Sequence, residues 1–241
     1  MEERRRRRKK KNPLLELARK YWFIAAGALA LILAVVLVSS IISGLNKYKE
    51  PVKLQQKVYN AKTAEKMFDA TLDQLNGLGE KEMKTIMDVL KDTNTGEYIV
   101  ANFENAIESR EENAGSNSKV KIKIEDKEKL DEYALEAMQE HIDSLAERYA
   151  SLAEEMEENK SDYEDKWDLS GKEVDKLIKA YKRLAKIFSK AKVTKGYSLD
   201  LQMKVTGKLL DEPMEASRSY KVYKIGGKWV SEDVFELFYY F

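Results

Sequence analysis

One uncharged segment limits what this chain of 241 residues can fold into. No residue from Tyr21 to Leu45 carries a charge, and the stretch from Trp22 to Ile42 would span roughly 32 Å as a helix at ~1.5 Å per residue. That length matches the hydrocarbon core of a bilayer, and Tyr21 and Trp22 stand where interfacial aromatic residues are expected. Residues 21–45 are therefore predicted to form a single transmembrane helix.

The flanking charges predict the orientation of this helix. Arg4 to Lys11 are all cationic, and residues 1–20 have a net charge of +7, which leaves the rest of the chain at −6 within a total of +1. The positive-inside rule places residues 1–20 in the cytoplasm, where they would also attract anionic lipid, and residues 46–241 outside the cell membrane. The apolar run exceeds that of a cleaved signal peptide, which favours an uncleaved anchor.

Composition excludes several classes of function for the outer part. Its acidic balance opposes binding to nucleic acid, whose phosphates need cations. The chain contains no cysteine, which excludes disulfide scaffolds, thiolate metal sites, cysteine nucleophiles and a lipid-modified cysteine anchor. The outer part must therefore be stabilised by its hydrophobic core.

Residues 46–118 are predicted to be a helical stalk followed by further N-terminal helices. Apolar residues recur at helical spacing from Pro51 to Leu75, and the turn residues 76–79 end that pattern. Two shorter amphipathic pieces follow, over 83–90 and 98–107. Residues 119–125 then alternate strictly between lysine or glutamate and a β-branched residue, which predicts a half-buried strand.

The longest periodic stretch predicts a helical hairpin over 127–190. Apolar residues from Leu135 to Met156 follow the 3-4 spacing of a heptad seam, residues 159–169 read as a loop, and Ser170 with Glu173 form a capping box that begins the second helix. The seam can pack within the domain or pair two chains as a homodimer. The residues that would mediate such a homodimer are Ile142, Leu145, Tyr149 and Leu152.

Residues 193–241 are predicted to form an antiparallel sheet. Apolar and polar residues alternate from Tyr197 to Thr206, residues 210–213 turn the chain, and a returning strand reaches a Gly226-Gly227 hairpin. The aromatic stretch 234–241 that follows is favoured as a closing core element over an exposed contact surface. The outer domain, 119–241, therefore belongs to the α+β class.

The C-terminal meander resembles a known type of domain. The stretch from Lys221 to Trp229, with its Gly227-Lys228-Trp229 closure, is similar to the cystatin-like and nuclear-transport-factor-like domains of membrane-anchored Gram-positive bacterial proteins of unknown function. The resemblance covers about 191–230 and implies a curved sheet wrapped around a helix. The two long helices over 130–188 depart from that pattern, and such domains imply no particular chemistry.

No residue pattern predicts catalysis, a cofactor or a metal. His141 is the only histidine, and no carboxylate lies at helical spacing from it. Two segments, 116–119 and 189–192, match the Ser-x-x-Lys motif of serine acyl-enzymes, but the partner motifs of those enzymes are missing. The acidic residues near 162–168 do not have the spacing of a calcium-binding loop. Trp167, in the same acidic loop, is expected to pack down rather than to meet a partner.

Three functional hypotheses follow. The first is a membrane-anchored extracytoplasmic binding or assembly module without catalysis, which contacts a protein partner through the concave face of the 197–205 strand and the C-terminal aromatic residues. The second is an envelope scaffold that dimerises as a coiled coil through 135–156. The third is an enzyme with a carboxylate-lined pocket. The partner-binding candidates for the first hypothesis are Tyr220, Trp229, Phe235 and Phe238.

Overall fold

The computed structural model describes residues 47–240, with side chains up to residue 236. The predicted transmembrane helix, 21–45, and the basic tail lie outside the described residues. Within the described part, no helix combines the length and apolar character needed to cross a membrane. The described elements, in chain order, are η1 (Lys47–Lys49), α2 (Glu50–Asn60), α3 (Ala64–Asp73), α4 (Glu80–Leu90), α5 (Asn94–Ala114), β1 (Lys119–Lys129), α6 (Glu132–Glu158), α7 (Lys160–Trp167), α8 (Gly171–Phe188), β2 (Val193–Thr206), β3 (Met214–Ile225), β4 (Lys228–Ser231) and η2 (Asp233–Tyr240).

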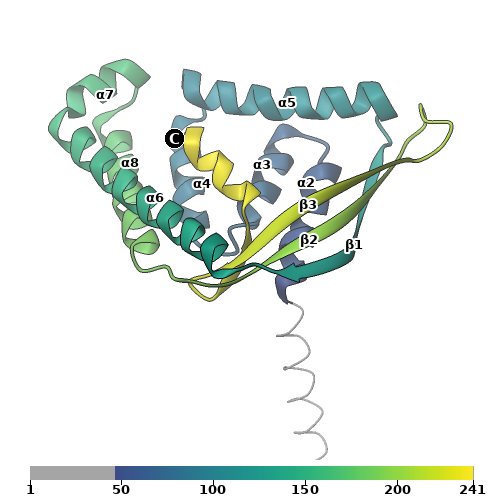
Figure 1. The fold of residues 1–241 in the computed structure, drawn as a ribbon. Helices are drawn as coiled ribbons and strands as arrows, with labels where there is room; N and C mark the ends of the chain where they lie inside the picture. The colour runs from purple at the N-terminus through teal and green to yellow at the C-terminus, as the bar shows by residue number, and fades with distance from the viewer. Residues whose placement is uncertain (1–46, 241) are drawn as a thin grey trace, which may run out of the picture. The chain divides into compact units, whose positions relative to one another are not determined.

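The described strands form one antiparallel sheet in the order β1-β2-β3-β4 (Figure 1). This confirms the α+β class and the predicted strand at 119–125, which continues to Lys129 with a bulge between Ile124 and Asp126. Gly226 and Gly227 both adopt positive φ and join β3 to β4, as the hairpin signal predicts. The sheet ends at Ser231 rather than continuing to the C-terminus, because residues 233–240 wind into the 3-10 helix η2.

Two hydrophobic cores lie on opposite faces of the sheet. Along β3, Tyr220 and Val222 point into the smaller core beneath η1 and α2, whereas Tyr223 and Ile225 point into the larger core shared with the helices. This alternation is the two-residue period of a strand that is buried on both faces. β3 therefore holds the two layers of the domain together, with α6 and α8 packed against one another on the larger-core side (Figure 1).

The predicted helical hairpin is present, and its seam faces inward. Ile142, Leu145 and Tyr149 are buried in the larger core, where the Tyr149 ring stacks on Tyr181 of α8, and Leu152 packs partly buried against the same core. The capping box of Ser170 and Glu173 is confirmed. The loop predicted over 159–169 is instead largely the short helix α7, and 127–129 belong to β1 rather than to the hairpin.

The prediction of one continuous helix from Pro51 to Leu75 is wrong. α2 ends at Asn60 and α3 begins at Ala64, with the Thr63 hydroxyl accepting the backbone N–H of Lys66 at 3.3 Å as an N-cap. The guanidinium of Arg110 donates to the carbonyls of Tyr59 and Ala61 and fixes this break. The sequence signal was the Thr63 cap, which apolar spacing alone does not reveal.

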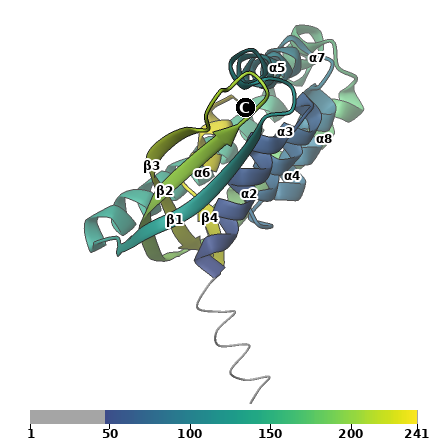
Figure 2. The same ribbon diagram turned by 90° about the vertical axis from the view of Figure 1, so that its right-hand side faces the viewer.

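The N-terminal helices are part of the folded domain rather than a separate stalk. One compact unit begins at Tyr48; the first half of α2 contributes Val52 to the smaller core on one face of the sheet, and its second half reaches the β1 edge (Figure 2). The amide of Asn60 pairs with β1 as a neighbouring strand would: its Nδ2 donates to the Val120 carbonyl at 2.8 Å, and its Oδ1 accepts the Val120 N–H at 2.9 Å. Gln56 accepts the N–H of Ile122 in the same way. Two side chains of α2 therefore cover part of an otherwise open edge.

Candidate functional site

Two concave sites flank the segment that joins β4 to η2. We call the first the cleft: it lies between α2, α3, α5 and the start of η2, with a volume of about 300 Å³. We call the second the groove: it lies between the first turns of α6, the adjoining ends of β1–β3 and the other side of η2, with a volume of about 680 Å³. Glu236 lines both sites, so η2 forms a shared wall.

The cleft has apolar walls. Three helices and η2 each contribute apolar side chains because their amphipathic faces converge there, and Phe103 of α5 is held edge-on against Phe68 of α3 with ring centroids 5.9 Å apart. Walls of this kind, with a few polar groups between them, are typical of small-ligand sites. The apolar lining residues are Val58, Met67, Ile99, Phe103, Ala106 and Val234.

Two buried glutamines supply the unusual polar groups of the cleft. Gln55 is 7% exposed and makes no side-chain hydrogen bond within the described part of the chain. Gln74 is 1% exposed and uses only its Oε1, which accepts the Tyr220 hydroxyl at 3.0 Å, so its Nε2 has no partner among the described residues. The cleft therefore presents two hydrogen-bonding groups that gain from a ligand.

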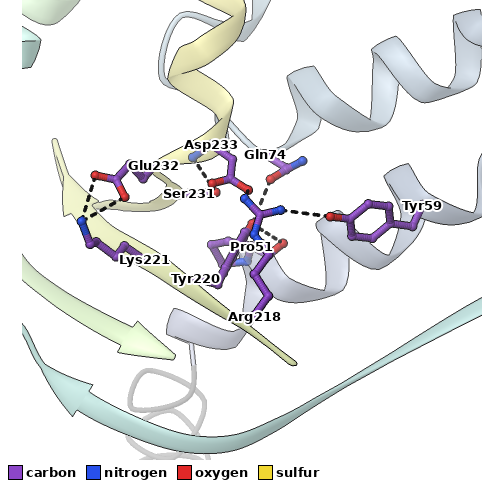
Figure 3. Close-up of polar contacts among 9 residues, drawn as sticks. All are labelled: Pro51, Tyr59, Gln74, Arg218, Tyr220, Lys221, Ser231, Glu232 and Asp233. Carbon is purple, nitrogen blue, oxygen red and sulfur yellow. Dashed lines mark hydrogen bonds and ion pairs between the residues drawn. The ribbon is translucent and has the colours of Figure 1, made fainter. Parts of the chain in front are cut away.

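An ion pair closes one end of the cleft (Figure 3). The Arg218 guanidinium donates to Asp233 Oδ2 at 2.6 Å and to the Tyr59 hydroxyl at 3.1 Å. The Tyr220 hydroxyl lies behind it, where it donates to Gln74 Oε1 at 3.0 Å and has the Pro51 carbonyl as a more distant second acceptor at 3.4 Å. The arrangement ties β3 to α2 and η2.

The charges in this network shift the pKa values of its members. Burial raises the pKa of Asp233, and the neighbouring Arg218 partly opposes this. Burial by itself lowers the pKa of Arg218, but Asp233 and Tyr59 more than compensate, so that the pKa of Arg218 is raised. Burial also raises the pKa of Tyr220. The raised pKa values of Arg218 and Tyr220 keep the guanidinium protonated and the phenol neutral at pH 7, and Arg218 opposes the effect of burial on Asp233.

The groove has a different chemical character. Its carboxylates outnumber its lysines, and Lys221 is already engaged by Glu232 at 3.4 Å (Figure 3). Tyr223, only 2% exposed, lines the groove from β3. Burial and the carboxylates of Glu232 and Asp131 raise its pKa to about 12, so the hydroxyl keeps its proton. The charged lining residues are Glu128, Lys129, Asp131, Lys221, Glu232 and Glu236.

His141, the lone histidine, lies on the wall of the groove rather than on an open helix surface. Its ring meets the Phe235 ring edge-on, with centroids 5.8 Å apart. Burial lowers its pKa, and Glu232 opposes that effect in part. A histidine with a lowered pKa is neutral at pH 7, so it adds no positive charge to the acidic groove.

Three of the four partner-binding candidates predicted from sequence are not surface residues. Tyr220, Phe235 and Trp229 are all buried, with the Trp229 ring stacked on Tyr197 at 5.4 Å between centroids. The side chain of Phe238 lies outside the described residues. Large aromatic side chains at these positions fill the cores, so a partner would touch the surface around them and not the rings themselves.

The other predicted sites have structural roles. Trp167 packs down as predicted, edge-on to Tyr163 with centroids 5.0 Å apart. No group of three or more candidate metal ligands occurs among the described residues, the acidic 162–168 stretch included.

The residues that sequence reasoning missed are Gln55, Gln74 and Arg218. A signal for Gln55 was present, because it lies three residues from both Val52 and Val58, on the buried face of α2. Arg218 carried no local signal, since its partners Tyr59 and Asp233 are distant along the chain.

Comparisons with family models, with curated proteins and with solved structures give no significant match for this chain. The cleft and the groove are therefore the basis for a functional proposal.

Proposed function

We propose that this chain is a membrane-anchored extracytoplasmic binding module without catalytic activity, built on a cystatin-like or nuclear-transport-factor-like arrangement. The uncharged segment 21–45 and the cationic run before it support the anchor and its orientation. An antiparallel sheet with α2 packed across one face supports the resemblance.

The observation that carries the binding role is the pair of buried, incompletely bonded amides, Gln55 and Gln74, between apolar walls. Neither amide is among the described side-chain atoms that are sealed from solvent without a partner, so the open part of each amide faces the cleft, where a ligand can reach it. Two of them facing one apolar cleft favour a ligand that is itself mostly apolar and that carries both a donor and an acceptor.

A peptide amide meets that description. The carboxamide of Asn60 already binds a backbone N–H and C=O together, at Val120 of the same chain. By the same geometry, Gln55 or Gln74 can receive the N–H and the C=O of one residue of a bound segment, while an aliphatic side chain of that segment enters between Phe103 and Ile99. The ligand proposed for the cleft is therefore a short apolar peptide segment.

The polar groups of the cleft do not favour catalysis. Thr71, the hydroxyl residue among the described lining residues, donates to the Met67 carbonyl at 2.7 Å. Asp233 is held by Arg218. A nucleophile needs a neighbouring base that is free to take its proton, and these groups do not provide one.

The cleft is tested with N-acetyl-L-leucinamide as the probe and the full chain in lipid nanodiscs, by saturation-transfer NMR. Ala106 lines the cleft from α5, and Ala106→Phe should fill it and abolish the transfer signal. Ala101→Phe, at an exposed position of the same helix, is the matched control and should leave the signal intact. An unchanged signal in Ala106→Phe would show that the probe does not bind in the cleft.

The location is tested separately. Because the chain has no cysteine, Ser217→Cys and Asn12→Cys each introduce a single thiol. A membrane-impermeant maleimide applied to intact cells should label the first and not the second. Labelling of the second alone would reverse the proposed orientation without bearing on the cleft.

A further inference from the structure

The groove on the other side of η2 has the features of a separate site for a positively charged group. It carries four carboxylates, from Glu128, Asp131, Glu232 and Glu236, against two lysines, Lys129 and Lys221. Glu232 already neutralises Lys221. The remaining carboxylates come from the end of β1, the start of α6 and η2, so three separate elements bring negative charge to one cavity.

Acidic residues on a surface are common, and a second feature distinguishes this groove. The Tyr223 side chain is only 2% exposed, yet its hydroxyl makes no hydrogen bond to any other described residue. The hydroxyl lies within the field of Asp131 and Glu232, which are lining residues of the same groove. The oxygen is not among the described atoms that are sealed from solvent without a partner, so it opens onto the groove and is an acceptor that a ligand can use.

The rest of the lining suits an aliphatic cation. Ala134, Ala137 and Met138 of α6 form an apolar wall along which methylene groups can pack. The rings of Tyr133, Tyr223 and Phe235 also line the groove, and their faces attract cations. A wall of this kind beside carboxylates favours an alkylammonium group over a bare metal ion, and no set of three metal ligands is present among the described residues.

We propose that the groove binds a primary alkylammonium group, with the Tyr223 hydroxyl accepting a hydrogen bond from the ammonium and Asp131 balancing its charge. The alkyl chain lies along α6. Two sources share this chemistry, a free polyamine and a lysine side chain of a polypeptide. The proposal does not depend on a ligand in the cleft, although the two sites share Glu236.

The test is calorimetric titration of the full chain in lipid nanodiscs made only of zwitterionic lipid. The probes are spermidine, the peptide acetyl-Lys-Ala-Lys-amide and the same peptide with both lysines acetylated. At least one of the cationic probes should bind, and the acetylated peptide should not. Binding by spermidine alone identifies a free amine as the ligand, whereas binding by the lysine peptide alone identifies a polypeptide.

Tyr223→Phe is the decisive variant because it removes one oxygen and leaves the net charge unchanged. A hydrogen bond to a charged group is worth about 1.5–3 kcal/mol, so the variant should weaken binding by roughly tenfold or more. Asp131→Asn keeps a good N-cap for α6 and should weaken binding by about threefold to tenfold. Glu140→Gln removes a carboxylate from an exposed position of α6 outside the groove and serves as the charge-matched control.

Three outcomes would overturn the proposal. They are a Tyr223→Phe variant that binds the cationic probes as the wild type does, a Glu140→Gln variant that weakens binding as much as Asp131→Asn, and equal binding of the acetylated peptide. The first two would mean that the probes gather on the acidic surface in general. Circular dichroism of each variant verifies that the fold is retained.

Discussion

Asn60 occupies the place that a further strand would take beside β1. Replacing Asn60 by alanine therefore tests how much this side chain stabilises the edge of the sheet. Its Oδ1 and Nδ2 satisfy the N–H and the C=O of Val120, a residue only 6% exposed. In Asn60→Ala both backbone groups lose their partner. Each loss costs about 1–3 kcal/mol when the group stays dry.

The expected magnitude lies at the lower end of that range. Asn60 and Val120 line a hollow of about 580 Å³ on this side of β1, so water can reach the freed groups in part. Taking about 1–1.5 kcal/mol for each group, and subtracting about 0.6 kcal/mol for the better helix propensity of alanine, gives a net loss of about 2 kcal/mol. For a domain of this size that loss lowers Tm by roughly 4–8 °C.

The assay is urea unfolding of the full chain in nanodiscs, followed by tryptophan fluorescence, together with hydrogen exchange at the Val120 amide. The midpoint should fall while the m-value stays constant, and Val120 should exchange faster than its neighbours. Asn113→Ala is the matched control, since the Asn113 amide donates to the Ser109 carbonyl from an exposed position near the end of α5. Equal midpoints for the two variants would refute the edge-protection argument.

Two further predictions concern the helical hairpin. Ile142→Glu should unfold the domain or destabilise it by several kcal/mol, because the Ile142 side chain is fully buried in the larger core. The control Ile142→Val should lower the free energy of unfolding by only about 0.5–1.5 kcal/mol. If light scattering instead shows that Ile142→Glu releases a folded monomer from a dimer, the result would support a coiled-coil interface. Two hydrogen bonds lower the pKa of Glu173, the larger effect coming from the Ser170 hydroxyl and the smaller from the Ser170 backbone N–H. The ionised Glu173 therefore stabilises the fold fully at pH values above the pKa of a glutamate in the unfolded chain. This stabilisation is lost as the pH falls through the lower pKa that Glu173 has in the folded chain. The Tm difference between pH 7 and pH 3 should therefore be smaller in Glu173→Gln than in the wild type.

Local sequence patterns predicted the helices and strands well where a property of a few neighbouring residues determines the element. The alternation through 197–206 and the two glycines at 226–227 identified β2 and the hairpin, because side-chain period and positive φ are properties of a few neighbouring residues. The heptad spacing from Leu135 to Met156 located α6, but it could not say whether the seam would meet α8 or a second chain. In the folded chain the seam packs against Tyr181 and its neighbours on α8, a long-range contact that local spacing does not contain.

The sites depend on pairings that no local pattern contains. Gln55 and Gln74 become functional candidates only because α2, α3, α5 and η2 converge around them. In the sequence, Tyr223 looks like an ordinary aromatic residue of a strand. It becomes a binding candidate only because the fold brings carboxylates near its hydroxyl, including that of Asp131, almost a hundred residues away. The aromatic residues near the C-terminus attracted attention by their size, yet size is what places Tyr220, Trp229 and Phe235 in the cores. Polar residues that line a cavity with part of their hydrogen-bonding capacity unused are therefore the stronger indicators of binding in this chain, because the folded protein leaves that capacity open to a ligand.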